Sequence, residues 1–452
     1  MTEDYTFYSV LSTLEMQHGG LTSASLRRAR ALYQEGKRSG VLVANYVPGF
    51  AELARTTDDH ILCPGVEIRN MFYDIARNPA LLVDSNTSME KFIESDSPRV
   101  ENLTAGSVSV NRYYDTSGNI VIVESSSNTF PERRYTVYDP DSGVTVLSAS
   151  NWELRRRWIR WVDAHRRSVF LIDGVSMGQA LASVDMNASL KYLMLHGTHS
   201  RIDSDGKRHL HSSREIPFRY SRKFDRVVVQ SETQERDVRE FVNNSVDVSV
   251  VPNVNTSSVA PVLESRPKVG IICTRLEEGQ KRISHILEIA ERVLAQSTDI
   301  SFEIYGEGQG EWASDRLSCR FRTVKGPDRI LFHGFVENAS EHYSRGLFTI
   351  LTSRYEGFPL NLVEASAGGC IPIAYDIDYG PADLVRDGRN GFLIQDGDID
   401  SVVERILELC SDEALASSMR KSATSVVDRF TPRAVVSVLT ELAEKDFASK
   451  SI

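Results

Sequence analysis

Short apolar runs alternate with amphipathic stretches along most of the 452-residue chain. Before residue 254 the apolar runs stand at 5–12, 40–46, 168–174, 191–197, 224–231 and 246–253. Between the first two runs, residues 18–36 pass from a glycine pair into a stretch with apolar side chains at helical spacing. Buried strands that alternate with helices form parallel sheets covered on both faces. The sequence therefore predicts a doubly wound, Rossmann-like α/β domain.

A second series of the same kind follows residues 254–267, which are polar, contain prolines and are typical of a linker. Its apolar runs stand at 268–276, 301–308, 330–336, 347–353, 370–376 and 391–394. We expect two doubly wound domains that face a cleft, formed by residues 1–70 with 151–254 and by residues 255–431. A last helix, over about 432–452, is expected to pack back on the N-terminal domain.

The segment between the two parts of the N-terminal domain, residues 71–150, has a different pattern. Its segments are short and alternate at every second residue, with turn sequences at 116–119 and 139–143 and no helical periodicity. This pattern predicts an inserted antiparallel β-meander. The exposed edges of such a sheet favour association of copies of the chain through it.

Two glutamates, Glu356 and Glu364, stand eight positions apart in the stretch 353–365. A strand precedes them and a helix starts near Pro359, so Glu356 is predicted on the loop and Glu364 one turn into the helix. The helix N-terminus between them attracts an anion. Carboxylates repel phosphate, so they would hold hydroxyl groups of a sugar or ribose of the same ligand. The alternative is a solvated pair of surface glutamates.

Other strand ends carry residues that suit the same ligand. Arg275 and Lys281 follow the first strand of the C-terminal domain, and together they can grip a diphosphate. Gly306 ends the next strand, where it would allow a flat base to approach the backbone. Gly19 and Gly20 precede the first helix and offer backbone amides.

Histidines and a basic helix leave alternatives open. His196 ends a strand at the cleft and His199 follows it, with two more histidines nearby. They suggest a metal site or simply a polar loop, and no cysteine is close enough to favour the metal. Residues 152–167 predict a helix with six arginines, Arg156 and Arg160 among them. Either its tryptophans pack and its basic face is solvated, or that face binds a polyanionic acceptor or anionic lipid headgroups.

Composition excludes several classes of function. The net charge of −10 argues against a nucleic-acid binder. Five scattered cysteines without a CxxC pair argue against a disulfide framework or a zinc site. The chain starts without a signal-peptide pattern and has no apolar run of membrane-spanning length. We expect a cytoplasmic protein, with peripheral contact to the inner face of the membrane.

The stretch "EGFPLNLVEA" resembles the E-x7-E motif of retaining nucleotide-sugar glycosyltransferases of family four, which have the GT-B fold. "GGLTSASLRRA", "TRLEEGQKRI", "YGEG" and "VRDGRNGFLI" follow the order of that family's motifs over nearly the whole chain, although "EEGQK" replaces its usual "SPEKG". The meander and "AYDIDYGPADLVRDGRNGFLI" resemble more narrowly the bacterial poly(glycerol- or ribitol-phosphate) α-glycosyltransferases of wall teichoic acid. They also resemble the related O-GlcNAc transferases of serine-rich adhesins.

The resemblance implies a role for each candidate residue. Arg275 and Lys281 would grip the donor diphosphate, supported by the amides of Gly19 and Gly20, while Glu364 would accept the ribose hydroxyls. The donor sugar would lie against Glu356, a set of loop residues and one histidine. That set is Phe358, Pro359 and Leu360, and the histidine is His196, with His199 as the second choice for a sugar or acceptor contact. Such enzymes are described as retaining and metal-independent, so no metal or other cofactor is expected.

The implied reaction is transfer of glucose or GlcNAc from a UDP-sugar to a hydroxyl of a poly(polyol-phosphate) such as teichoic acid. The alternatives are an O-GlcNAc transferase for a serine-rich protein and a non-catalytic glycan-binding partner subunit. The sequence leaves the choice between glucose and GlcNAc open.

Overall fold

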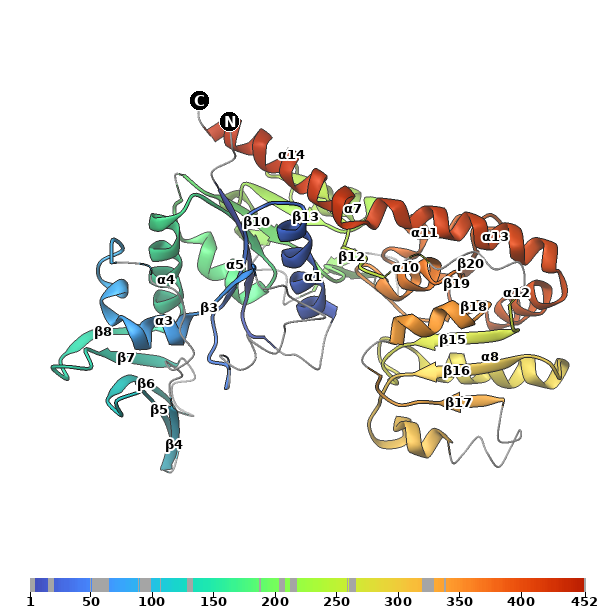
Figure 1. The fold of residues 1–452 in the computed structure, drawn as a ribbon, viewed down its shortest axis with the longest axis horizontal. Coiled ribbons are helices and arrows are strands. Elements are labelled where there is room, and N and C mark those ends of the chain that lie inside the picture. The colour runs from blue at the N-terminus through green and yellow to red at the C-terminus, as the bar shows by residue number, and fades with distance from the viewer. Residues whose placement is uncertain are drawn as a thin grey trace.

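The structure is a computed structural model that describes residues 5–14, 20–48, 50, 65–87, 89, 99–105, 107–127, 133–186, 188–202, 208–211, 218–257, 259, 266–318, 329–336 and 339–450. Figure 1 shows two α/β units side by side, with a small antiparallel sheet beyond the N-terminal unit. The fold therefore has the two doubly wound units and the β-meander that the sequence predicts.

The N-terminal unit contains a seven-stranded parallel sheet in the order β14-β13-β10-β9-β1-β2-β3. Its strands are β1 (Thr6–Leu11), β2 (Ser39–Val43), β3 (Glu67–Asn70), β9 (Ser168–Ile172), β10 (Leu190–Met194), β13 (Arg226–Val229) and β14 (Asp247–Val250). Its helices are α1 (Gly20–Gln34), α4 (Asn151–His165), α5 (Val175–Ala182), α7 (Glu232–Phe241) and the 3-10 turn η3 (Ser221–Lys223). A two-stranded hairpin, β11 (Ser200–Ile202) with β12 (Arg208–Leu210), follows β10.

The C-terminal unit contains a six-stranded parallel sheet in the order β17-β16-β15-β18-β19-β20. Its strands are β15 (Val269–Cys273), β16 (Ser301–Tyr305), β17 (Ile330–Phe332), β18 (Phe348–Leu351), β19 (Ile371–Asp376) and β20 (Phe392–Gln395). Its α-helices are α8 (Ile283–Gln296), α10 (Leu360–Ala367), α11 (Pro381–Leu384), α12 (Ile399–Ser411) and α13 (Glu413–Val426). Its 3-10 helices are η4 (Gly310–Trp312), η5 (Ala339–Arg345) and η6 (Val427–Phe430).

The order of the strands in each sheet predicts where a ligand would bind. The order of each sheet reverses direction next to its first strand, between β1 and β9 in one unit and between β15 and β18 in the other. Ligands of open α/β sheets bind beyond the carboxyl ends of the strands at such switch points. The loops that follow these four strands therefore define where a ligand is expected.

The inserted segment forms a five-stranded antiparallel meander of β4 (Arg99–Ala105), β5 (Val108–Tyr114), β6 (Ile120–Ser127), β7 (Arg134–Tyr138) and β8 (Thr145–Ser150). The prediction of no helix in residues 71–150 is wrong at its start, where α3 (Met71–Arg77) and the 3-10 helix η1 (Pro79–Leu82) stand. Every residue of α3 from Met71 to Ala76 is buried, so the helix lacks the polar face that would reveal a period of 3.6.

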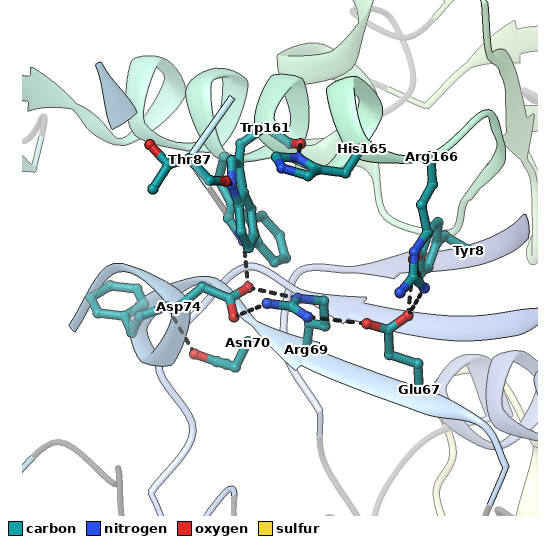
Figure 2. Close-up of polar contacts among 11 residues, drawn as sticks. Tyr8, Glu67, Arg69, Asn70, Asp74, Thr87, Trp161, His165 and Arg166 are labelled. Carbon is teal, nitrogen blue, oxygen red and sulfur yellow. Dashed lines mark hydrogen bonds and ion pairs between the residues drawn. The ribbon is translucent and has the colours of Figure 1, made fainter. Parts of the chain in front are cut away.

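Helix α4 carries the arginine-rich sequence, and a buried polar network fastens it to the sheet. Figure 2 shows the Asp74 carboxylate facing Arg69, which donates to it at 2.7 and 3.1 Å. Trp158 of α4 donates its indole N–H to the same carboxylate at 2.8 Å. Arg69 also donates to Glu67, and Glu67 pairs with Arg166 just beyond α4. These charges therefore serve the attachment of the helix.

The remaining arginines of this stretch are mostly engaged as well. Arg155 is buried and donates to Asn45, Arg157 pairs with Glu153, and the Arg167 guanidinium lies over the Phe447 ring. Arg160 is exposed, and it forms no ion pair within the part of the chain that the structure describes. The packed-helix interpretation accounts for most of the basic sequence.

Helix α14 (Pro432–Lys450) ends the described chain and packs on the N-terminal unit. Arg226 of β13 pairs with Asp446, and the Tyr192 hydroxyl donates to the same carboxylate at 2.6 Å. The helix shares a buried apolar cluster with β1 and β10. The limits of the domains themselves stay a prediction.

Candidate active site

Glu356 lies on the loop between β18 and α10 and is only 7% exposed. Its Oε1 accepts hydrogen bonds from Lys281 Nζ and from the Ser353 hydroxyl, both at 2.6 Å. Gln280 donates to Oε2 at 3.4 Å. A carboxylate this buried needs such partners, because an unpaired buried charge is costly. The arrangement contradicts the alternative of a solvated surface pair.

The loop between β15 and α8 supplies the positively charged residues of the candidate site. Arg275 is exposed, with 66% of its side chain accessible, and donates to the Gln280 side chain at 2.9 Å. Gln280 also donates to the carbonyl of Tyr355 at 3.1 Å, so it joins this loop to the Glu356 loop. Lys281 stands two residues before α8 and points at Glu356. The structure thus brings Arg275, Lys281 and Glu356 together at one switch point.

Glu364 lies in α10, which starts at Leu360 with Pro359 as its N-cap rather than as its first residue. Arg27 of α1 donates to the Glu364 carboxylate at 2.7 Å, and both side chains are partly buried. Because Arg27 belongs to the N-terminal unit, this ion pair crosses between the two units. Arg27 was not among the predicted site residues, because it is one of several arginines in the predicted helix.

The two units also touch at Gly357. A β-carbon at this position would lie 2.2 Å from the carbonyl oxygen of His196 and 2.7 Å from Cα of Gly197. Real β-carbons do not approach other atoms so closely, so the loop that carries Glu356 meets the end of β10 only because residue 357 is glycine. This contact sets Glu356 and His196 on opposite sides of one junction.

His196 belongs to a polar network at the carboxyl ends of three strands, β9, β10 and β13. Gln230 donates to His196 Nδ1 at 2.7 Å, so Nε2 carries the proton and donates to Asp173 Oδ1 at 2.5 Å. Arg28 donates to Asp173 Oδ2 at 2.6 Å. Both imidazole nitrogens are engaged, and the ring is therefore held in one orientation.

Asp173 is completely buried within this network. Burial would raise the pKa of its carboxyl, but the Arg28 guanidinium and the hydrogen bond with His196 outweigh burial and hold that pKa below its ordinary value. Asp173 and Gln230 were missed in the sequence, although each follows a buried run at a strand end. Position at the strand end was the signal that could have found them.

His199 is placed differently from the expected acceptor contact. It is 0% exposed, and its ring stacks between Phe218 and Tyr379, with ring centroids 5.7 and 5.5 Å apart. Tyr379 donates to Asp237 at 2.6 Å and accepts from Arg208 at 2.7 Å. His199 thus packs in the junction of the two units, where an acceptor could not reach it without a rearrangement.

The backbone packing around residue 306 requires a glycine there. Its φ is +144°, and a β-carbon there would lie 1.7 Å from the carbonyl oxygen of Thr274. The glycine is therefore required by the crossing of the β15 and β16 ends, whether or not a base approaches it. Its amide donates to the carbonyl of Gly334 at 2.8 Å.

The other predicted contacts have mixed outcomes. Phe358 is buried and packs on Phe430, with ring centroids 5.3 Å apart. The amide of Leu360 donates to the carbonyl of Phe358, so it is already engaged. Gly20 is the first residue of α1, and Gly19 lies outside the described residues.

Arg156 and Arg160 do not lie in the cleft. Figure 1 places α4 on the side of the N-terminal unit that faces away from the C-terminal unit. Arg156 is engaged by Glu153 and by the Ser183 hydroxyl. Any contact of these arginines with an acceptor would therefore be remote from Glu356.

No group of three or more histidine, cysteine, aspartate or glutamate side chains in the described part of the chain could hold a metal ion. No described helix combines the length and the apolar character needed to cross a bilayer.

Comparison with known proteins finds a family match for the C-terminal unit. Residues 255–426 match the family Glycosyl transferases group 1, which confirms the predicted resemblance for this part of the chain. The poly(ribitol-phosphate) alpha-N-acetylglucosaminyltransferase of Staphylococcus aureus is 25% identical over 278 residues, 60% of this chain and 54% of the relative. The poly(glycerol-phosphate) alpha-glucosyltransferase of Bacillus subtilis is 23% identical over 298 residues, 65% of this chain and 43% of the relative. The chain spans about half the length of these curated relatives.

A solved structure extends the likeness to the whole fold. The crystal structure of a mutant of S. aureus TarM, in complex with Fondaparinux, alpha-GlcNAc-glycerol and UDP, is similar with a TM-score of 0.72. The match covers 97% of this chain and 99% of that chain at 18% identity. The predicted GT-B fold is thereby confirmed.

Replacing Gly357 with alanine should separate the two units. The added methyl group has no room against His196, so the loop and the end of β10 must move apart. We expect a larger radius of gyration by small-angle X-ray scattering with an unchanged circular dichroism spectrum. Gly178→Ala is the control, because its β-carbon would meet only the end of the Leu193 side chain, at 3.1 Å. Identical scattering from Gly357→Ala and wild type would contradict the contact.

Replacing Asp173 with asparagine should cost about 3 kcal/mol of stability, because Arg28 loses its buried counter-charge. Since the folded-state pKa lies below its ordinary value of about 3.9, the carboxylate stays ionised from about pH 8 to pH 5. The difference in unfolding free energy between wild type and variant should stay constant over that range. It should shrink only as the pH falls through the folded-state pKa.

Asp163→Asn provides the opposite control for this titration. Burial raises the pKa of Asp163, so the effect of that substitution should already change with pH above about 4. Denaturant unfolding at a series of pH values measures the stability difference between wild type and each variant. A stability difference for Asp173→Asn that shrinks between about pH 8 and pH 5 would mean that its pKa is raised, against the network described above.

Proposed function

We propose that the protein is a retaining hexosyltransferase that moves glucose or GlcNAc from a UDP-sugar to a hydroxyl of a poly(polyol-phosphate) acceptor. The observation that carries this proposal is the site at the β15 and β18 ends, where Lys281 and Gln280 hold Glu356 and Gln280 also holds Arg275. This site meets the ordered His196 of the other unit through Gly357. Such a junction offers cations for a diphosphate and a buried carboxylate for sugar hydroxyls.

The donor would displace the ion pairs seen in the free protein. Its diphosphate would draw Lys281 from Glu356 and engage the exposed Arg275, while its ribose hydroxyls would replace Arg27 on Glu364. Glu356, released from Lys281, would accept hydroxyls of the sugar. His196 would lie against the sugar on the side of the N-terminal unit, because Asp173 and Gln230 fix the orientation of the imidazole ring.

The reaction transfers the sugar with retention at its anomeric carbon. The bond between that carbon and the β-phosphate oxygen of UDP breaks, and the acceptor oxygen forms a new bond on the same face. The acceptor proton passes to the departing diphosphate. Negative charge develops on that diphosphate, and Arg275 with Lys281 would stabilise it, so we propose that no divalent metal is required.

The acceptor assignment rests on the relatives and on the meander. The two curated relatives named above act on poly(ribitol-phosphate) and poly(glycerol-phosphate), and their names give GlcNAc and glucose as donor sugars. We place the reaction at the cytoplasmic face of the membrane, where such polymers would be assembled. The alternative acceptor is a serine-rich protein. The alternative to an enzyme is a glycan-binding subunit that does not catalyse transfer.

Release of UDP from UDP-glucose or UDP-GlcNAc tests the reaction and its residues. Arg275→Ala should slow transfer by about 10²-fold, the effect of losing a preorganised charge at the leaving group. Glu356→Gln should lower turnover more than it weakens UDP binding. Arg292→Ala, an exposed arginine on α8, is the control and should behave as wild type.

Activity should also survive EDTA. A complete loss of activity that a divalent metal restores would contradict the proposal that Arg275 and Lys281 alone stabilise the departing diphosphate. Absence of release from any UDP-, GDP- or ADP-sugar, with or without acceptor, would favour the non-catalytic glycan-binding subunit.

Ionic strength separates the two acceptor classes. A polyanionic chain is attracted through long-range charge, which salt screens beyond about 8 Å at about 0.15 M. Acceptor affinity should therefore fall as salt rises past that value, while hydrolysis of the UDP-sugar alone changes little. A serine-rich acceptor would show no such dependence.

The combined change Arg156→Glu with Arg160→Glu tests whether a long polymer also touches α4, outside the cleft. We expect it to weaken use of long acceptors and to leave hydrolysis unchanged. A wild-type acceptor affinity in this variant would remove α4 from the acceptor site.

A further inference from the structure

A rigid turn after α11 presents two arginines, Arg386 and Arg389. Asn390 is only 3% exposed and holds this turn from inside: its Oδ1 accepts from the amide of Arg386 at 2.6 Å, and its Nδ2 donates to the carbonyl of Leu384 at 2.8 Å. The amide of Arg389 donates to the carbonyl of Arg386 at 3.0 Å. The backbone under both side chains is therefore fixed before any ligand arrives.

A third arginine, Arg429, comes from η6 and faces the same place. Its guanidinium donates to the carbonyl of Asp383 at 2.7 Å and lies over the Phe430 ring, 5.1 Å from the centroid. Together the three arginines line a cavity of about 230 Å³ between the turn and α13. The remaining lining side chains that carry polar groups are Asp383, Asn390, Ser422 and Ser425.

The lining of this cavity carries excess positive charge, with three arginines against one carboxylate. Within the described residues, Arg386, Arg389 and Arg429 form no ion pair, whereas many other arginines of the chain do. Asp383 is the lining carboxylate, and both of its oxygens are committed to the start of α7. Oδ1 accepts from the amide of Glu232 at 2.8 Å, and Oδ2 accepts from the Thr233 hydroxyl at 2.7 Å.

The serine hydroxyls do not offer their protons to a ligand. Ser422 donates to the carbonyl of Ser418, and Ser425 donates to the carbonyl of Ser422, as helix residues often do. The donors left for a ligand are guanidinium N–H groups, whose planar fork matches the oxygens of a phosphate group. This chemistry favours a charged oxyanion over a neutral sugar.

We propose that the cavity of Arg386, Arg389 and Arg429 binds a phosphate-class oxyanion at a site separate from the Glu356 junction. The cavity is linked to the loop that carries Glu356, because Phe430 next to Arg429 packs on Phe358 of that loop. The oxyanion is either free phosphate or a phosphodiester of the acceptor polymer. The second source rests on the function proposed above.

Inorganic phosphate, titrated into the full chain by calorimetry, tests the site. Saturating UDP is present throughout to occupy the Arg275–Lys281 side of the cleft. We expect saturable binding of one phosphate, weakened at least about tenfold in the variant Arg386→Gln/Arg389→Gln/Arg429→Gln, since each lost guanidinium removes a charge-assisted hydrogen bond. Arg292→Gln, a change of the same kind elsewhere on the surface, should bind phosphate as wild type does.

Glycerol phosphate oligomers distinguish the sources. If the oligomers bind at least tenfold more tightly than phosphate, and lose that advantage in the triple variant, the ligand of the cavity is the polymer. Equal affinities for oligomer and phosphate would make free phosphate the ligand. Absence of saturable phosphate binding, or unchanged binding in a triple variant whose circular dichroism spectrum matches wild type, would overturn the site. Turnover of UDP-sugar is measured on the same samples, so a failure of the proposed reaction is seen separately from a failure of phosphate binding.

Discussion

The two α/β units meet at a point where no side chain fits. Gly357 lies against the backbone of His196 and Gly197, so the loop after β18 and the end of β10 can close on each other. The contacts of the candidate site that cross between the units depend on this approach. It brings Glu356 to the N-terminal unit, and it lies beside the Arg27–Glu364 ion pair and the Tyr379 contacts that also join the units. A single β-carbon at residue 357 would disturb them together.

Charge balance explains how buried carboxylates persist at this junction. Glu356 and Glu364 are both largely buried, and each has a cation within hydrogen-bonding distance, Lys281 and Arg27. In the proposed enzyme the same cations and carboxylates would serve the diphosphate, ribose and sugar of the donor. The ion pairs of the free protein would then keep the site folded until a ligand with both phosphate and hydroxyl groups replaces them.

The sequence predicted what depends on local pattern and failed where distant packing decides. Both sheets, the meander and the strand-end positions of Glu356 and Lys281 follow from periodicity and from the rule that ligands lie at carboxyl ends of parallel strands. Helix α3 was missed because nearly all of it is buried. The stacking of His199 and the pairing of Arg27 with Glu364, 337 positions apart, depend on how the units pack, which no local pattern records.

A crystal structure of the protein with UDP-GlcNAc or UDP-glucose tests the central claim most directly. We predict the ribose hydroxyls on Glu364 in place of Arg27, the diphosphate on Arg275 and Lys281, and the sugar against Glu356. A nucleotide bound elsewhere, or bound in the cleft with the Lys281–Glu356 and Arg27–Glu364 pairs intact, would contradict the account.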